Sequence, residues 1–271
     1  MDQCGIQCIE ADVMDRHTLH EPLDMVDVVY DLASPPPGAG AEEYAKFNTV
    51  ALNNLLEEAN EHGAKVFVYL SCLDVYGSGP IEAGVSPRPR DDYQKAKLEA
   101  EKIVSDFGRE KPDMKVRIVR AARAIGPRDT TLTVPLLKMV ERGKVILPAG
   151  ANAAISFSHP KDIAQSLLKA ATYVGDLETC MVKSFDATTE NYAKALSNAT
   201  GKKAEVKSAG LFSGKTLLPT YTTEQIRAGL VLKQQETWNK ISYMPAYTIE
   251  KTADEVSEWN RKEPWSTQDQ A

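Results

Sequence analysis

The chain has 271 residues, of which 42% are apolar, 26% charged and 7% aromatic, and its net charge is −6. This apolar share builds one sizeable core, or a core plus a small lobe, and excludes disorder for the bulk of the chain. A pI near 5.4 argues against a nucleic-acid binder, and no apolar run reaches the roughly 18–20 residues that span a bilayer. The start shows no signal peptide, and the four cysteines form no Cys-x-x-Cys pair. We therefore expect a cytoplasmic protein that binds neither nucleic acid nor membrane.

Short β-branched runs alternate with longer amphipathic stretches along the first half of the chain. Near-continuous apolar runs are typical of strands that are covered on both faces. The expected strands are residues 5–10, 26–33, 65–71 and 115–120, and the expected helices are 42–61, 92–107 and 132–141. Alternation at this spacing predicts the α/β class, with a parallel sheet.

The alternation of strand-like and helix-like segments becomes less regular after about residue 148. Pro160 suits the first turn of a helix over 160–173, because its missing N–H would be unpaired there anyway. A strand at 181–185 and helices at 189–199 and about 249–259 are expected after it. We divide the chain into an α/β domain, residues 1–175, and a small mixed α/β lobe, residues 176–271.

Tyr93 and Lys97 lie four residues apart on a predicted helix, so both project from one face. A lysine ammonium beside a phenol favours the phenolate, which lowers the tyrosine pKa and makes the hydroxyl a usable acid or base. The chain also contains Tyr247 and Lys251 at the same spacing, which we interpret as chance. The first pair differs because it follows a buried strand and a proline-rich loop, as ligand groups do at the carboxyl edge of open α/β sheets.

Several segments around this pair, in chain order, resemble one family. They are Glu10–Asp15, Asp27–Ser34, Asn48–Ala59, Ser71-Cys72, Val75-Tyr76-Gly77, Tyr93–Lys97 with Glu101, Arg120–Asp129 and Ser156–Ala164. Together they resemble the extended short-chain dehydrogenases/reductases of the NAD-dependent epimerase/dehydratase type, over roughly residues 6–175. The resemblance implies a Rossmann-like parallel sheet with helices on both faces and a small C-terminal substrate lobe.

The resemblance also implies roles for individual residues. Tyr93 would exchange a proton with a substrate hydroxyl or carbonyl, and Lys97 would lower the Tyr93 pKa and hold the nicotinamide ribose. The cofactor-binding residues would be Asp12 and Val13 at the adenine, Leu32, Ala33 and Ser34 along the cofactor path, and Ser71, Tyr93 and Lys97. The cofactor would be NAD or NADP, and the substrate a sugar-like or other small molecule with a carbonyl or hydroxyl group.

One departure from the family is the absence of its opening β-α-β unit. That unit carries a Gly-x-x-Gly-x-x-Gly turn, which offers backbone N–H groups at a helix N-terminus to the pyrophosphate. This chain opens at what resembles the third strand. Three hypotheses stay open: an NAD(P)-dependent epimerase, dehydratase or reductase; a catalytically impaired member that binds or scaffolds; or a chain that starts late. NAD(P) binding by the 271 residues is expected to be weak.

Two side chains also depart from the family pattern. Cys72 stands where the family places the serine or threonine that hydrogen-bonds the reacting oxygen, and a thiol is a weaker donor. It is either a reactive catalytic thiol or a small buried residue at a strand end. Arg123 stands where many nucleotide-sugar members have asparagine. Its planar fork suits a phosphate or carboxylate of the substrate, and the alternative is a solvated loop charge.

The four histidines, His17, His20, His62 and His159, lack a spacing for a shared metal site, so we expect no metal centre.

The missing strands also affect residues 6–10. Without the family's first two strands, this segment would lie about 10 Å from 26–32. A lone strand there would leave its backbone groups unpaired. We expect residues 6–10 to shift inward and pair with 26–32. The two alternatives are that another chain supplies strands to fill the gap, or that the segment is poorly ordered. The exposed apolar sheet face also favours association into a homo-oligomer.

Overall fold

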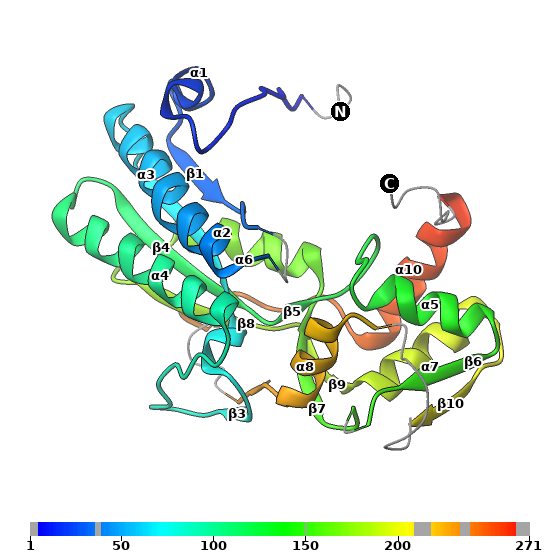
Figure 1. Cartoon of the computed structure of the whole chain (residues 1–271). Helices are drawn as coiled ribbons and strands as arrows, with labels where there is room; N and C mark the ends of the chain where they lie inside the picture. Colours follow the sequence, from blue (N-terminus) through cyan, green and yellow to red (C-terminus); the bar gives the residue numbers. More distant parts are fainter. Residues whose placement is uncertain (1–4, 36–38, 150, 209–217, 234–238, 264–271) are drawn as a thin grey trace.

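The computed structural model describes residues 5–35, 39–149, 151–208, 218–233 and 239–263. Its central element is a four-stranded parallel sheet of order β1-β2-β4-β8 (Figure 1). The strands are β1 (Val28–Asp31), β2 (Val66–Cys72), β4 (Lys115–Ala121) and β8 (Thr179–Val182). The predicted α/β class is confirmed, and the ends of β1, β2 and β4 lie within two residues of their predicted bounds.

Helices cover both faces of this sheet, because alternate residues of a strand point to opposite sides. Phe67 and Tyr69 of β2 pack on one side against α3 and α4, whereas Val68 packs on the other side against α6. The helices are α3 (Leu52–Glu61), α4 (Asp92–Glu110) and α6 (Pro160–Thr172). Burial on both faces explains why the strand sequences are almost continuously apolar.

A second core lies around a three-stranded sheet of order β5-β7-β9, at the lower right of Figure 1. Its elements are β5 (Arg123–Ala124), β7 (Ala154–Ser158), β9 (Phe185–Thr188), α5 (Thr133–Glu141), α7 (Thr189–Thr200) and α10 (Ile249–Lys262). Two short parallel pairs flank it: β3 (Pro80–Ile81) with β11 (Val231–Leu232), and β6 (Lys144–Leu147) with β10 (Glu205–Ser208).

The remaining helical elements are short, apart from the nine-residue helix α8. They are η2 (Arg16–Leu19), α1 (His20–Leu23), α2 (Ala41–Lys46), the π-helical turn η3 (Phe47–Ala51), the 3-10 turn η4 (Leu73–Tyr76) and α8 (Thr220–Ala228). The predicted helix over 42–61 is thus continuous from α2 to α3 with a π turn in its middle. Within the described ranges, no helix combines the length and the apolar character needed to cross a membrane.

The expected strand at the N-terminus is wrong. Residues 5–10 contain no strand, and β1 pairs with β2 alone within the described part of the chain. The inward shift of residues 6–10 onto β1 therefore does not occur. The physical reason is the pattern of its apolar side chains: Ile6 and Ile9 fall on opposite faces of a strand, so no single face could be buried and no register is selected. Both side chains are exposed.

The expected strand at 181–185 is also corrected, because the chain changes sheets there. β8 ends at Val182 in the central sheet, and β9 begins at Phe185 in the second one. Ser184 secures the crossing: its hydroxyl donates to the Asp162 carboxylate (2.5 Å) and accepts the His159 backbone N–H (2.9 Å). The division at residue 175 stays a prediction, since strands from both sides of it pair in each sheet.

A buried ion pair joins α4 to the central sheet. The Glu101 carboxylate accepts hydrogen bonds from Arg120 Nε (2.9 and 3.1 Å), from Arg120 Nη2 (2.6 Å) and from the Ser71 hydroxyl (2.5 Å). Ser71 and Arg120 are paired across β2 and β4, and Arg120 Nη1 also donates to the Tyr76 hydroxyl (2.7 Å). Glu101 is only 4% exposed. The position of α4 on the sheet therefore depends on this carboxylate.

We predict that Glu101→Gln lowers the free energy of unfolding by about 3–5 kcal/mol, because it leaves a buried guanidinium without its counter-charge. The matched control is Glu190→Gln, which breaks the more exposed pair with Lys194 on α7 (2.6 Å) and should cost at most about 1 kcal/mol. Urea denaturation followed by circular dichroism measures both values. Equal losses for the two variants would contradict the structural role of Glu101.

Candidate active site

A cavity of about 250 Å³ lies at the carboxyl ends of β1, β2 and β4. Parallel α/β sheets bind ligands at this edge, because the loops that follow each strand meet there. Seven of the residues predicted as functional line it: Leu32, Ser34, Ser71, Cys72, Tyr93, Lys97 and Arg123. A larger open groove, about 840 Å³, runs along α10 and contains none of them.

Helix α4 presents Tyr93 and Lys97 to the cavity from consecutive turns, as their spacing predicts. The helix begins after Asp91, whose carboxylate caps it by accepting the Gln94 backbone N–H (2.8 Å). The Tyr93 ring packs edge-on against Tyr44 and Tyr221, with centroids 5.5 and 5.6 Å away. These aromatic contacts hold the phenol ring in place against the cavity.

The expected lowering of the Tyr93 pKa by Lys97 is wrong for this arrangement. Burial raises the pKa of Tyr93 well above its usual value, and the neighbouring Cys72 raises it further. Lys97 does not reverse this shift; its ammonium donates to the Leu70 carbonyl oxygen (2.9 Å) and lies 4.3 Å from the centroid of the Tyr69 ring. Burial also lowers the pKa of Lys97. Tyr93 is therefore a neutral phenol at neutral pH.

Cys72 lies beside the Tyr93 hydroxyl at the end of β2. Burial raises the pKa of this thiol to about 12, and the Asp74 carboxylate adds to the shift, whereas Lys97 and the hydrogen bond with Tyr93 oppose it. The thiol is therefore protonated at neutral pH, and a protonated thiol is a poor nucleophile. The environment favours the interpretation of Cys72 as a small structural residue at a strand end, where it is partly buried against the core.

The predicted cofactor residues that follow β1, and the one on β2, differ in their surroundings. Leu32 and Ser34 line the cavity and are exposed, whereas Ala33 lies between them and its N–H donates to the Asp31 carboxylate (3.0 Å). Ser71 also lines the cavity, but its hydroxyl is already bonded to Glu101.

Asp12 and Val13 lie apart from the cavity lining. The Asp12 carboxylate accepts the Met14 N–H (2.8 Å), and the Val13 carbonyl accepts a hydrogen bond from the Asn54 side chain on α3 (3.1 Å). They lie instead in the segment before η2, which is fastened to α3. Their role at the adenine stays a prediction.

Arg123 reaches the cavity from β5. Its Nη2 donates to the Thr131 hydroxyl (2.7 Å), whereas its Nε is buried and has no hydrogen-bond partner among the described residues. This location excludes a fully solvated loop charge. A partly buried guanidinium in the cavity lining is suited to an anionic or oxygen-rich ligand group.

Four polar cavity residues were not predicted from the sequence: Asp74, Thr131, Tyr221 and Gln225. Tyr221 donates to the Asp74 carboxylate (3.1 Å), and the Gln225 amide donates to Asp74 and to the Tyr221 hydroxyl (2.7 Å). Burial raises the pKa of Asp74 despite these hydrogen bonds. The only sequence signal was the i, i+4 spacing of Tyr221 and Gln225, which alone could not connect them to residue 74, about 150 positions earlier.

Comparison with known proteins assigns the family. The model of the NAD dependent epimerase/dehydratase family matches residues 2–179. The chain belongs to this family. The predicted resemblance is therefore confirmed.

Individual relatives are distant. A probable UDP-arabinose 4-epimerase 3 from Oryza sativa subsp. japonica is 27% identical over 227 residues, covering 78% of this chain and 54% of that protein. The sterol-4-alpha-carboxylate 3-dehydrogenase, decarboxylating, of Mus musculus is 23% identical over 197 residues, covering 70% and 54%. The chain thus spans about half the length of these curated relatives.

Among solved structures, the UDP-glucose 4-epimerase of Thermus thermophilus in complex with NAD has a TM-score of 0.76 at 16% identity. The alignment covers 96% of this chain and 86% of that one. This likeness confirms the Rossmann-type fold.

We predict that iodoacetamide at pH 7.5 alkylates the exposed thiol of Cys8 and leaves Cys72 and Cys180 unmodified. The pKa of the partly buried Cys72 thiol and that of the buried Cys180 thiol are each raised to about 12, so the reactive thiolate is scarce at any pH well below that value. Peptide mass spectrometry measures the modification, and the urea-unfolded chain is the control in which all thiols react. Rapid modification of native Cys72 at pH 7.5 would restore the reactive-thiol hypothesis.

Proposed function

We propose that the protein is an NAD(P)-dependent epimerase, dehydratase or reductase in which Tyr93 transfers a proton to or from a carbonyl or hydroxyl oxygen of a sugar-like substrate. The observation that carries the proposal is the single cavity that holds Tyr93 and Lys97 at the carboxyl edge of the parallel sheet. Membership of the family and the UDP-sugar epimerases among its relatives support this substrate class.

The cavity residues fit the nicotinamide end of the cofactor. The Lys97 ammonium and the Tyr93 hydroxyl provide polar groups for the ribose, and the exposed Leu32 provides an apolar surface. When bound, NAD(P) would supply hydride transfer. The 271 residues contain no Gly-x-x-Gly pair, so this chain offers the pyrophosphate no glycine-rich turn. The fit is thus limited to one end of the cofactor.

The protein itself would supply the proton that is transferred, from the hydroxyl of Tyr93. Because burial keeps Tyr93 protonated, its phenol is ready to donate to an oxygen that gains negative charge during reduction. Lys97 stands in the same cavity as a source of positive charge. The Arg123 guanidinium, which lines the cavity, would bind an anionic group of the substrate, such as a phosphate or carboxylate.

The second candidate function is a catalytically impaired member that binds or scaffolds. The observation that favours it is Cys72, a protonated thiol at the position where the family has a hydroxyl donor. The two candidates differ in turnover, since a scaffold would bind without hydride transfer. Substitution of the proton donor separates them.

We predict that Tyr93→Phe lowers kcat by about 100- to 10,000-fold, because it removes the transferable proton. Lys97→Met should lower kcat/KM comparably. Tyr247→Phe, in the other Tyr-x-x-x-Lys pair, should leave both constants unchanged, since its ring remains stacked on His159 (3.6 Å between centroids). Turnover of a panel of UDP-sugars at millimolar cofactor is followed by chromatographic separation of the products, since epimerisation causes no net change in NAD(P)H, and net reduction or oxidation is followed by NAD(P)H absorbance. Wild-type turnover no faster than that of Tyr93→Phe would support the scaffold instead.

We predict that the 271-residue chain binds NAD(H) about a thousandfold more weakly than a family member with a complete glycine turn. The loss of two or three charged hydrogen bonds, each about 1.5–3 kcal/mol, accounts for this factor. Isothermal titration calorimetry with NADH measures the affinity, and a UDP-glucose 4-epimerase that carries the turn is the reference. A low-micromolar Kd would show that another segment holds the phosphates.

A further inference from the structure

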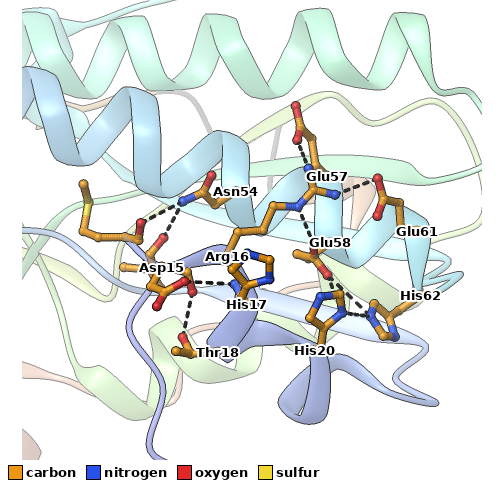
Figure 2. A network of polar contacts seen from close by, with 12 residues as sticks. Asp15, Arg16, His17, Thr18, His20, Asn54, Glu57, Glu58, Glu61 and His62 are labelled. Atoms are coloured by element: carbon orange, nitrogen blue, oxygen red, sulfur yellow. Dashed lines mark hydrogen bonds and ion pairs between the residues drawn. The ribbon is translucent and has the colours of Figure 1, made fainter.

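A second polar cluster lies away from the active-site cavity, where η2 and α1 meet the C-terminal end of α3. Figure 2 shows His20, Glu58 and His62 directed toward one another, with Arg16 on the other side of Glu58. His20 comes from α1, Glu58 from the last turn of α3, and His62 directly follows that helix. The spacing of the histidines in the sequence predicts no shared site. For His20 and His62 this expectation is wrong, because the fold brings the two side chains together although they are 42 positions apart in the sequence.

The three facing atoms form a nearly equilateral triangle. His20 Nδ1 lies 3.1 Å from His62 Nε2 and 3.2 Å from Glu58 Oε2, and His62 Nε2 lies 3.4 Å from Glu58 Oε2. Zinc binds histidine nitrogen and carboxylate oxygen at about 2.0–2.2 Å in tetrahedral geometry, so two of its ligands lie about 3.3–3.5 Å apart. The observed edges agree with this value to within a few tenths of an ångström. A small cation therefore fits above the triangle without large side-chain movement.

The Glu58 carboxylate is the second, independent indication of a ligand. Glu58 is 1% exposed, and its buried Oε2 accepts no hydrogen bond from the described residues; the His20 and His62 imidazoles form ion pairs with this oxygen only when they are protonated. The other oxygen, Oε1, accepts from Arg16 Nε. Arg16 thus fixes the orientation of the carboxylate and leaves one oxygen directed at the two imidazoles. A buried, oriented and unsatisfied carboxylate oxygen is costly unless a cation or donor meets it.

The surroundings support a cation rather than a purely hydrogen-bonded cluster. The Asp24 carboxylate lies 4.0 Å from His62 Nδ1, the nitrogen that faces away from the triangle, as outer carboxylates do behind metal-binding histidines. Glu57 and Glu61 lie beside Arg16, so carboxylates outnumber the guanidinium around the site.

We propose that His20 Nδ1, His62 Nε2 and Glu58 Oε2 form a binding site for Zn²⁺ or a similar divalent transition metal. Two histidines and one carboxylate make a three-ligand set, and the exposed side of His20 leaves the fourth position to water. The metal would join the η2–α1 segment to α3 at the end of the helix that leads into β2. Its role is structural, since none of its ligands lines the active-site cavity.

The test is Zn²⁺ binding by the full chain in a Cys8→Ser background, which removes an exposed thiol that could bind zinc. We expect one Zn²⁺ per chain in competition with a chromogenic chelator, and Co²⁺ should give the visible absorption of a tetrahedral site. His20→Ala and His62→Ala should each lower the affinity at least about 100-fold. His17→Ala is the matched control, because this histidine lies in the same segment but outside the triangle.

Thermal unfolding provides a second readout. Zn²⁺ should raise the Tm of the background protein and of His17→Ala, and should leave the Tm of His20→Ala and His62→Ala unchanged. The two histidine variants change partly or largely exposed side chains, so they should fold, and circular dichroism checks this. Absence of stoichiometric Zn²⁺ binding, or equal affinity in His17→Ala and His20→Ala, would overturn the proposal. Neither result bears on the Tyr93 variants, so the two proposals fail separately.

Discussion

The geometry of the candidate active site depends on one ion pair, between Glu101 and Arg120. Glu101 sits one helical turn after Lys97 and two turns after Tyr93, so whatever fixes Glu101 on the sheet also fixes both cavity residues. Arg120 and Ser71 hold Glu101 in place, since they donate hydrogen bonds to its carboxylate from two neighbouring strands. Charges in a low-dielectric interior cannot remain unpaired without a large cost, so a helix shifted along the sheet would be strongly disfavoured. Helix α4 therefore has one register, and the cavity has one geometry.

The same burial sets the chemistry of the cavity. It raises the pKa values of Tyr93, Cys72 and Asp74, because desolvation penalises an additional negative charge. Tyr93 and Cys72 are consequently neutral hydrogen-bond donors. Lys97 and Arg123 are the basic residues among those that line the cavity. This composition suits an oxygen-rich or anionic ligand and makes proton donation, rather than thiolate attack, the available chemistry.

The two proposed sites lie at opposite ends of the central sheet. The cavity is formed where β1, β2 and β4 end, whereas the histidine cluster lies just before β2 begins. Parallel strands separate these ends by their length, so the two sites share no ligand. A metal at the second site would act on catalysis only through stability. It would fasten the η2–α1 segment, which otherwise meets α3 through exposed or partly exposed side chains such as Arg16.

The sequence by itself determined the features that depend on local spacing. The unbroken apolar runs predicted a sheet covered on both faces, and the i, i+4 spacing placed Tyr93 and Lys97 on the same wall. The order of several short motifs along the chain indicated the family. Tertiary structure alone decided which distant residues meet: His20 with His62, and Asp74 with Tyr221. It also decided the pKa of Tyr93, because the direction of that shift depends on burial and on where the Lys97 ammonium is held, and neither is set by neighbours along the chain.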